Sequence, residues 1–262
     1  MKVLMYGYAR PEYVWLTLNS LFYNSDSAKV YLTINGDRPT MHRTYTILDE
    51  FIERYPDRFN CLYLRDNFIQ NAVDLSYQMA KPEEDEIICI TEDDIIIPCY
   101  FKGMYGDFLA KMGERVSNNR RLIGESVCGV SFSEHNCYEN GKYGSLRENL
   151  YNGFYKEQIG TWYMCLSEAR YRTLSKQFKR VPHDTELRRG LNSETIDNVA
   201  YHLGWNRQID YPAYYDKLYE ERVTKQFQDM KKPPETNPWI LYGYVNGKSI
   251  RNEEWKWSWN ES

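Results

Sequence analysis

The chain has 262 residues, of which 42% are hydrophobic and 27% charged, a balance that fits one large globular α/β domain and excludes an intrinsically disordered protein. Its formal net charge of -4 excludes a general basic footprint for nucleic acid. The six cysteines include no C-x-x-C pair, so we expect reduced thiols and no zinc site. No apolar run reaches the length of a membrane span. We therefore expect a cytoplasmic protein of a bacterial or phage-infected cell.

The first 115 residues alternate strand patterns with helical patterns. Four strands are predicted, at 3–8, 29–35, 60–64 and 87–90. The helices predicted between them cover 12–23, a segment that ends before Pro56, and 71–79. An alternation of this kind predicts a parallel sheet with covering helices.

The second half of the chain has weaker patterns. The predicted elements are a helix over 101–112, strands at 126–131 and 160–166, a helix over 168–178 capped by Ser167, and a helix over 195–203. Residues 134–155 are rich in Asn, Gly and Tyr, which favours loops or short strands. Lys231-Lys232-Pro233-Pro234 then breaks the chain before an aromatic tail, which we expect to pack back on the core.

Three acidic residues, Glu92-Asp93-Asp94, directly follow the fourth predicted strand. Their mutual repulsion costs free energy, which a bound cation would relieve. The carboxyl ends of central strands are where open α/β sheets bind ligands. Mg²⁺ and Mn²⁺ take a few oxygen ligands and complete their shells with water and substrate phosphates. The motif therefore predicts a metal–diphosphate site, and an acidic turn exposed to water is the alternative.

Four stretches, in this order, resemble the nucleotide-sugar glycosyltransferases of the GT-A fold. The first is Tyr6-Gly7-Tyr8-Ala9-Arg10-Pro11-Glu12-Tyr13, followed by Thr17-Leu18-Asn19-Ser20-Leu21, and the second is the strand that ends at Gly36-Asp37. The third is Arg65-Asp66-Asn67 leading into Asn71-Ala72, and the fourth is Glu92-Asp93-Asp94 as the counterpart of the family's D-x-D. The Glu-Asp-Asp form is most similar to the inverting, family 2-like N-acetylglucosaminyltransferases. The resemblance covers roughly the first half of the chain, is weaker between 122 and 216, and fails over the tail.

The resemblance implies a fold and a division of the chain. The fold is α/β of the GT-A (Rossmann-like) type, with a mixed, mostly parallel sheet, helices on both faces and an irregular C-terminal acceptor-side region. The GT-A domain would span 1–230, with a nucleotide-sugar-binding half at 1–115 and an acceptor-side half at 116–230. The aromatic tail would span 231–262.

The resemblance also implies a nucleotide-sugar donor, a UDP-sugar by preference, bound together with Mn²⁺ or Mg²⁺. Asp94 matches the position that contacts the metal in similar enzymes. Glu92 and Asp93 would lie toward the ribose and the sugar. One bound metal ion would neutralise the charge of the leaving diphosphate and orient the donor.

Three further residues match donor-binding positions of the family. Arg10 and Asp37 correspond to residues that hold the nucleobase and ribose, and Arg65 could pair with phosphate through its planar fork. Each has an ordinary structural alternative. Asp37 could be a turn residue, and Arg65 could form a surface ion pair with Asp66.

An inverting transfer also needs a general base near the acceptor hydroxyl. The resemblance indicates Asp197 or Glu194 and slightly favours Asp197, because similar enzymes place an Asp at the start of such a helix. Acidic residues are also ordinary at helix starts, where they favour that end of the helix dipole. Trp162 and Tyr163 could stack on an acceptor sugar, although we expect at least one of them to be a core residue.

The sequence therefore predicts a metal-dependent, inverting hexosyl- or N-acetylhexosaminyl-transferase. The acceptor would be a hydroxyl group of a glycan or of a modified DNA base. A nucleotidyltransferase is one alternative, but Tyr8-Ala9-Arg10-Pro11 lacks the expected Gly-rich, Lys-containing turn. A non-catalytic sugar-binding module is another, but it would not need the acidic motif. The hypothesis fails if Asp93 and Asp94 face away from any cavity, or if arginines hold them and leave no room for a nucleotide.

Overall fold

The computed structural model describes residues 1–8, 10–35, 38–64, 69–97, 99–118, 124–126, 163–178, 193–195, 201–202 and 240–250. The predicted loops at 134–155 and the tryptophans of the tail lie outside these residues. Within them, the first half of the chain alternates strands and helices as predicted. Its elements are β1 (Lys2–Tyr8), α1 (Pro11–Asn24), β2 (Lys29–Asn35), α2 (Arg38–Arg54), β3 (Phe59–Leu64), α3 (Ile69–Ala80) and β4 (Ile87–Glu92).

These four strands form the parallel centre of the sheet. β1 pairs in parallel with both β2 and β4, and β2 pairs in parallel with β3. Each strand is an apolar run that is buried on both faces, as β3 illustrates with all six of its residues buried. Pro11 stands in the first turn of α1, where its missing N–H costs nothing, and Val14, Leu18 and Leu21 bury one side of that helix.

The remaining described elements extend this sheet or flank it. They are β5 (Ile95–Ile96), α4 (Tyr100–Tyr105), α5 (Phe108–Asn118), β6 (Gly124–Ser126), β7 (Met164–Ser167), α8 (Glu168–Phe178), β8 (Ser193–Thr195), β9 (Tyr201–His202), β10 (Ile240–Val245) and β11 (Lys248–Ile250). Among the described residues, nine strands form one sheet in the order β11-β10-β3-β2-β1-β4-β7-β6-β8, and β5 and β9 form a second, small sheet. The large sheet is mixed, because β7 runs antiparallel to β4 and β6, and β10 runs antiparallel to β3.

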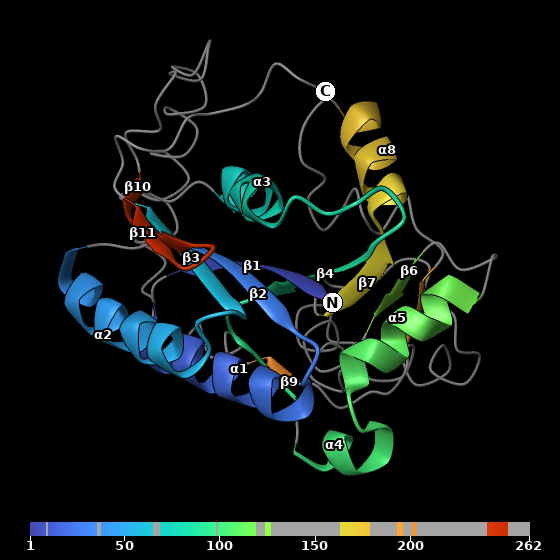
Figure 1. Cartoon of the computed structure of the whole chain (residues 1–262), viewed down its shortest axis with the longest axis horizontal. Helices are drawn as coiled ribbons and strands as arrows, with labels where there is room; N and C mark the ends of the chain where they lie inside the picture. Colours follow the sequence, from blue (N-terminus) through green and yellow to red (C-terminus); the bar gives the residue numbers. More distant parts are fainter. Residues whose placement is uncertain are drawn as a thin grey trace, which may run out of the picture.

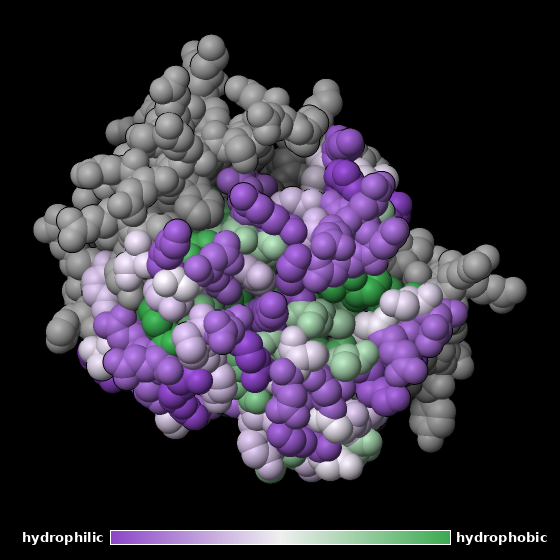
Figure 2. Space-filling view, in the orientation of Figure 1, coloured by the Kyte–Doolittle hydropathy of each residue, from purple (hydrophilic) through white to green (hydrophobic). Residues whose placement is uncertain are grey.

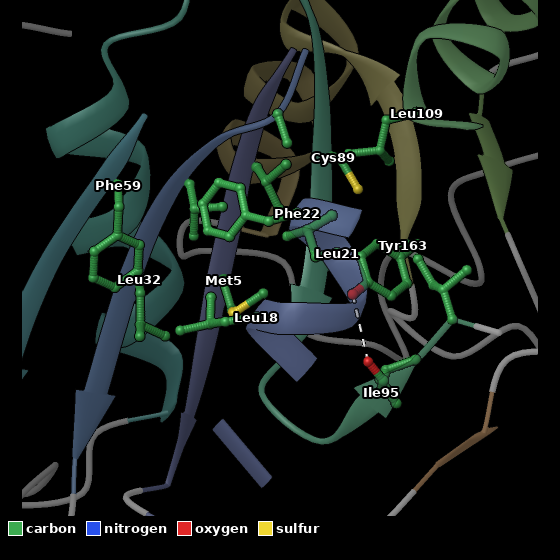
Figure 3. Packing of buried hydrophobic residues seen from close by; sticks show 14 of the residues in the cluster. Met5, Leu18, Leu21, Phe22, Leu32, Phe59, Cys89, Ile95, Leu109 and Tyr163 are labelled. Carbon is green, nitrogen blue, oxygen red and sulfur yellow. Dashed lines mark hydrogen bonds between the residues drawn. The ribbon is translucent and has the colours of Figure 1, made fainter. Parts of the chain in front are cut away.

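Helices cover both faces of the sheet. Figure 1 shows α1, α2 and α5 on one side of the strands and α3 and α8 on the other. The larger apolar cluster joins α1, α2 and α5 to the sheet and contains Leu18, Phe51 and Met112; Figure 3 shows part of it. The second cluster lies under α3 and α8 and contains Leu75 and Leu174. This arrangement confirms the predicted α/β layers.

Two predicted helices differ from the structure. The helix expected over 101–112 is two helices, because Gly106 adopts a positive φ of 69° and Asp107 Oδ1 accepts a hydrogen bond from Ala110 N at the start of α5. The helix expected over 195–203 is wrong at both of its described ends. Ser193–Thr195 forms β8 in parallel with β6, and Tyr201–His202 forms β9 against β5. Pairing with distant strands has overridden a local helical pattern.

Two other predicted strands are covered in part. Of the strand expected over 126–131, only Ser126 is described, and it is the last residue of β6. Of the strand expected over 160–166, the structure describes β7, which begins at Met164. The tail beyond 231 contributes β10, which joins the same sheet beside β3. Among the helices of the described residues, none is long and apolar enough to cross a membrane. Figure 2 shows that hydrophilic side chains cover most of the described surface on the side in view.

Candidate functional site

The order of the strands makes the boundary between β1 and β4 the switch point of the sheet. The chain passes from β1 to β2 and β3 on one side, and then returns to place β4 on the other side of β1. In open α/β sheets, ligands bind at such a switch point, outside the carboxyl ends of the strands. Arg10 follows the carboxyl end of β1, and Asp93 and Asp94 follow that of β4. The topology therefore brings the basic turn and the acidic turn to the same place.

Arg10 forms an ion pair with both aspartates. Its Nη2 atom donates hydrogen bonds to Asp93 Oδ1 at 3.1 Å and to Asp94 Oδ2 at 2.6 Å. The Arg10 side chain is only 13% exposed, and the two carboxylates are at most 1% exposed. The acidic turn is therefore neither exposed to water nor without a cation. The cation that relieves its repulsion in this structure is a guanidinium, where we expected a metal ion from the sequence.

The electrostatics of this triad are set by burial. Burial raises the pKa of Asp93 to about 7, the Arg10 guanidinium opposes this rise, and the neighbouring Asp94 adds to it. For Arg10, burial alone would lower the pKa, but the two carboxylates raise it well above the usual value. Arg10 therefore stays charged, and its guanidinium favours the ionised form of Asp93 against the effect of burial.

Two neighbours on β1 shape the acidic turn. A Cβ atom added to Gly7 would lie 1.9 Å from Asp93 Cγ, so only glycine admits the carboxyl group at this position. Tyr6 pairs with Glu92 across the two strands, and its hydroxyl group donates to Glu92 Oε1 at 3.2 Å. In the sequence, Tyr6 and Gly7 only open the first of the stretches that resemble the family, and the register of β1 against β4 is what gives them a role.

A second set of contacts holds the segment after the acidic turn. Ile97 N donates to Ser20 Oγ at 3.3 Å, and Asn24 Nδ2 donates to Ile97 O at 3.2 Å. The Asn24 side chain also accepts a hydrogen bond from Lys102 N at 3.0 Å, although it is almost fully buried. Helix α1 thus fixes the backbone that leaves the acidic turn. The sequence offered no signal for these polar residues beyond their place on a buried helix face.

Tyr163 belongs to this support and not to an acceptor site. It is completely buried, and its ring packs edge-on against Phe108. Its hydroxyl group donates to Ile95 O at 3.4 Å, the bond that Figure 3 marks with a dashed line. A fully buried ring cannot stack on an acceptor sugar, so the acceptor role suggested for Tyr163 is wrong. The expectation that one of the pair Trp162 and Tyr163 is a core residue is confirmed.

The other predicted site residues are only partly covered by the structure. Glu194 lies in β8, which pairs with β6, and the structure describes only its backbone. Residues outside the described ranges are Asp37, Arg65, Trp162 and Asp197. The helix that favoured Asp197 over Glu194 is not formed at Thr195, so this part of the reason for preferring Asp197 is removed.

The donor set at the switch point fits a hard divalent cation only in part. Among the described residues, no three His, Cys, Asp or Glu side chains gather into a complete metal site. Mg²⁺ and Mn²⁺ sites often use one or two carboxylates and leave the remaining positions to water and phosphate. Asp93 Oδ2 is buried and has no hydrogen-bond partner within the described chain. A buried carboxylate oxygen of this kind suits such a partial shell.

Comparison with known proteins shows the fold. No protein-family model matches the sequence, and no curated protein matches it. Among solved structures, the chain is similar to the mannosyltransferase PcManGT from Pyrobaculum calidifontis in complex with GDP-Man and Mn²⁺, with a TM-score of 0.51, 15% identity, and coverage of 89% of this chain and 65% of that chain. It is more distantly similar to S. aureus TarS 1-349 in complex with UDP-GlcNAc, with a TM-score of 0.45, 11% identity, and coverage of 87% and 72%.

The likeness to the mannosyltransferase shows that this chain has the GT-A fold that we predicted, with its mixed, mostly parallel sheet. At 15% identity it shows the fold and not the reaction. The chain also spans only about 65% of that protein's length. The reaction must therefore be argued from the residues at the switch point.

Proposed function

We propose that this chain is a metal-dependent, inverting glycosyltransferase that moves a sugar from a nucleotide-diphosphate donor, a UDP-sugar by preference, to a hydroxyl group of a glycan. One observation carries the proposal. Arg10, Asp93 and Asp94 converge at the switch point of a fold that the chain shares with a mannosyltransferase bound to GDP-Man and Mn²⁺. We do not extend the proposal to DNA as an acceptor, because the net charge of -4 offers no general attraction for a polyanion.

The donor would lie along the acidic turn. Asp94 would hold Mn²⁺ or Mg²⁺, and Glu92 and Asp93 would lie toward the ribose and the sugar. The ion, when bound, would stabilise the negative charge of the departing nucleoside diphosphate. The buried position of Asp93 and Asp94 supports this assignment, because electrostatic interactions are stronger where water is excluded. Gly7 and Asn24 would keep the turn in place.

Two further residues complete the proposed donor site, and their assignment rests on the sequence resemblance. Asp37 follows the carboxyl end of β2 and would hold the nucleobase or ribose. Arg65 follows the carboxyl end of β3 and would pair with phosphate. Because β1, β2, β3 and β4 are parallel, all of these residues follow strands that end at the same edge of the sheet. That shared edge supports one common donor site.

The general base would come from the segment around β8. We keep Asp197 and Glu194 as the two candidates, with Trp162 as the aromatic contact to the acceptor. Asp197→Asn and Glu194→Gln are tested separately for turnover and for donor binding. The base variant should lose nearly all turnover and retain donor binding, because the base acts on the acceptor hydroxyl. If both variants turn over at the wild-type rate, neither residue is the base.

Calorimetry with UDP, in the presence and absence of Mn²⁺, tests the proposal as a whole. We expect UDP to bind with Mn²⁺, and we expect Asp94→Asn to weaken this binding by at least about tenfold, because a metal ligand is lost. Asp74→Asn is the matched control, since it also neutralises an aspartate, but one on α3 whose carboxylate is bonded by Gln78 Nε2. A screen of nucleotide sugars for slow, Mn²⁺-dependent hydrolysis would then identify the donor.

Other outcomes would assign a different function. If UDP binds with the same affinity with and without Mn²⁺, and equally well to Asp94→Asn, the proposed metal site is wrong. Binding of a nucleoside triphosphate in place of UDP would indicate nucleotidyl transfer. Binding of a free sugar without any nucleotide would indicate a sugar-binding module.

A further inference from the structure

The carboxylate proposed to hold the metal, Asp94, is already paired with a cation. Arg10 Nη2 reaches both Asp93 Oδ1 and Asp94 Oδ2, and none of the three side chains is more than 13% exposed. Such a buried ion pair is held firmly, because separating it would leave charges without solvation. A divalent ion that approaches Asp94 would therefore meet a like charge in a site with little water.

We propose that Arg10 competes with the divalent ion for Asp94, and that the diphosphate of the nucleotide ends this competition by drawing the guanidinium away. This inference rests on the proposed function. Arg10 Nη2 lies 2.6 Å from Asp94 Oδ2. Mg²⁺ binds oxygen at about 2.0–2.1 Å, so no ion fits between these two atoms. An ion that takes this oxygen from the same side requires Arg10 to withdraw.

The charge of the site explains why the nucleotide is needed. At rest, two carboxylates and one guanidinium give a formal charge of -1. A divalent ion alone would turn this into a net positive charge in a buried site, which is unfavourable. The two ionised phosphates of a nucleotide diphosphate sugar would return the total to its resting value. Metal and nucleotide should therefore bind cooperatively, and Arg10 should be the source of much of that coupling.

The guanidinium of Arg10 is suited to donate hydrogen bonds to a phosphate, and this proposal replaces the nucleobase and ribose contact that the sequence resemblance implied for Arg10. Its Nε atom is buried and has no hydrogen-bond partner within the described part of the chain. The group also lies over the ring of Tyr13, 4.8 Å from its centroid, in a contact that does not involve the carboxylates. A planar fork with an unused donor matches the geometry of a phosphate group.

The experiment measures Mn²⁺ binding from the electron paramagnetic resonance signal of the free ion. Wild type is titrated with and without saturating UDP, and Arg10→Gln is titrated in the same way. We expect wild type to bind Mn²⁺ weakly alone and at least about tenfold more tightly with UDP. Arg10→Gln should bind Mn²⁺ alone at least about tenfold more tightly than wild type, and UDP should change its affinity by less than about threefold.

Two further variants separate the charge of Arg10 from its shape and its position. Arg10→Lys keeps the charge and loses the fork, so its Mn²⁺ affinity without UDP should stay near that of wild type while the effect of UDP falls. This variant also tests the inference if Arg10→Gln does not fold. Arg172→Gln is the matched control, because Arg172 likewise bridges two carboxylates, Glu168 at 2.8 Å and Glu84 at 3.5 Å. It should leave both Mn²⁺ titrations unchanged.

The Mn²⁺ titrations separate the competition from the movement of Arg10 to the diphosphate. If wild type binds Mn²⁺ with UDP, but Arg10→Gln alone binds Mn²⁺ no more tightly than wild type alone, then Arg10 does not compete with the ion for Asp94. If UDP raises the Mn²⁺ affinity of Arg10→Gln and Arg10→Lys as much as it does for wild type, then Arg10 does not move to the diphosphate. If neither wild type nor Arg10→Gln binds Mn²⁺ under any condition, the proposed function and this inference fall together.

Discussion

The carboxyl group of Asp93 lies directly over the backbone of Gly7, where a Cβ atom would stand 1.9 Å from Asp93 Cγ. The absence of a side chain on β1 therefore sets the position of the acidic turn after β4. This contact joins two parts of the chain that lie more than 80 residues apart in sequence. Replacing Gly7 therefore tests the position of the acidic turn without removing a charged side chain.

Gly7→Ala should displace Asp93 and weaken Mn²⁺-dependent UDP binding by at least about tenfold, because the carboxylate must leave its place over β1. The stability cost should be about 1–3 kcal/mol, as is typical of overpacking. Urea unfolding and calorimetry measure the two effects. Gly103→Ala is the matched control, since an added Cβ there meets nothing within 4 Å. Equal behaviour of the two variants would show that the contact with Asp93 has no consequence.

Asn24→Ala should destabilise the fold by about 2–4 kcal/mol, because the Ile97 carbonyl loses its hydrogen bond from the buried amide and the Lys102 N–H keeps only its longer bond to Cys99 O. Urea denaturation measures this cost. Asn19→Ala on the same helix is the control, since Asn19 Nδ2 also donates to a backbone carbonyl, Trp15 O, but at the surface. A loss in Asn24→Ala no larger than in Asn19→Ala would contradict the role of Asn24 in holding the segment after the acidic turn.

The stability of the protein should depend on pH through Asp74 on α3. Burial raises the pKa of Asp74 to about 6, and a hydrogen bond from Gln78 Nε2 opposes the rise. Because the folded-state pKa is above the unfolded value, the contribution of Asp74 is fully present below about pH 4 and is lost as the pH rises through about 6. A shift of this size corresponds to at most about 3 kcal/mol, and to less here because the side chain is partly exposed.

Asp74→Asn should remove this dependence. The difference in unfolding free energy between wild type and Asp74→Asn, measured by urea denaturation from pH 4 to pH 7, should fall as the pH rises. Asp57→Asn, at an exposed turn after α2, controls for the loss of one negative charge. A difference that stays constant or grows across this range would contradict the raised pKa of Asp74.

Local patterns predicted the parallel centre of the fold because each of its elements has a clear period of its own. β1 to β4 are apolar runs bounded by turns, and α1 to α3 carry apolar residues at helical spacing. The acidic turn was also evident from the sequence, since Glu92-Asp93-Asp94 directly follows such a run. Local patterns failed at Thr195, where a helix was expected to begin, because Ser193–Thr195 pairs with β6 instead.

The sequence by itself thus determined the alternating elements, their apolar faces and the three carboxylates after β4. Only the tertiary structure decided that β10 lies beside β3, that Tyr163 is a core residue, and that Arg10 holds Asp93 and Asp94. The physical reason is that periodicity reports which face of an element is buried but carries no information about its neighbour. The order of strands in the sheet supplies that neighbour, and here it places a guanidinium where the acidic turn alone indicated a metal ion.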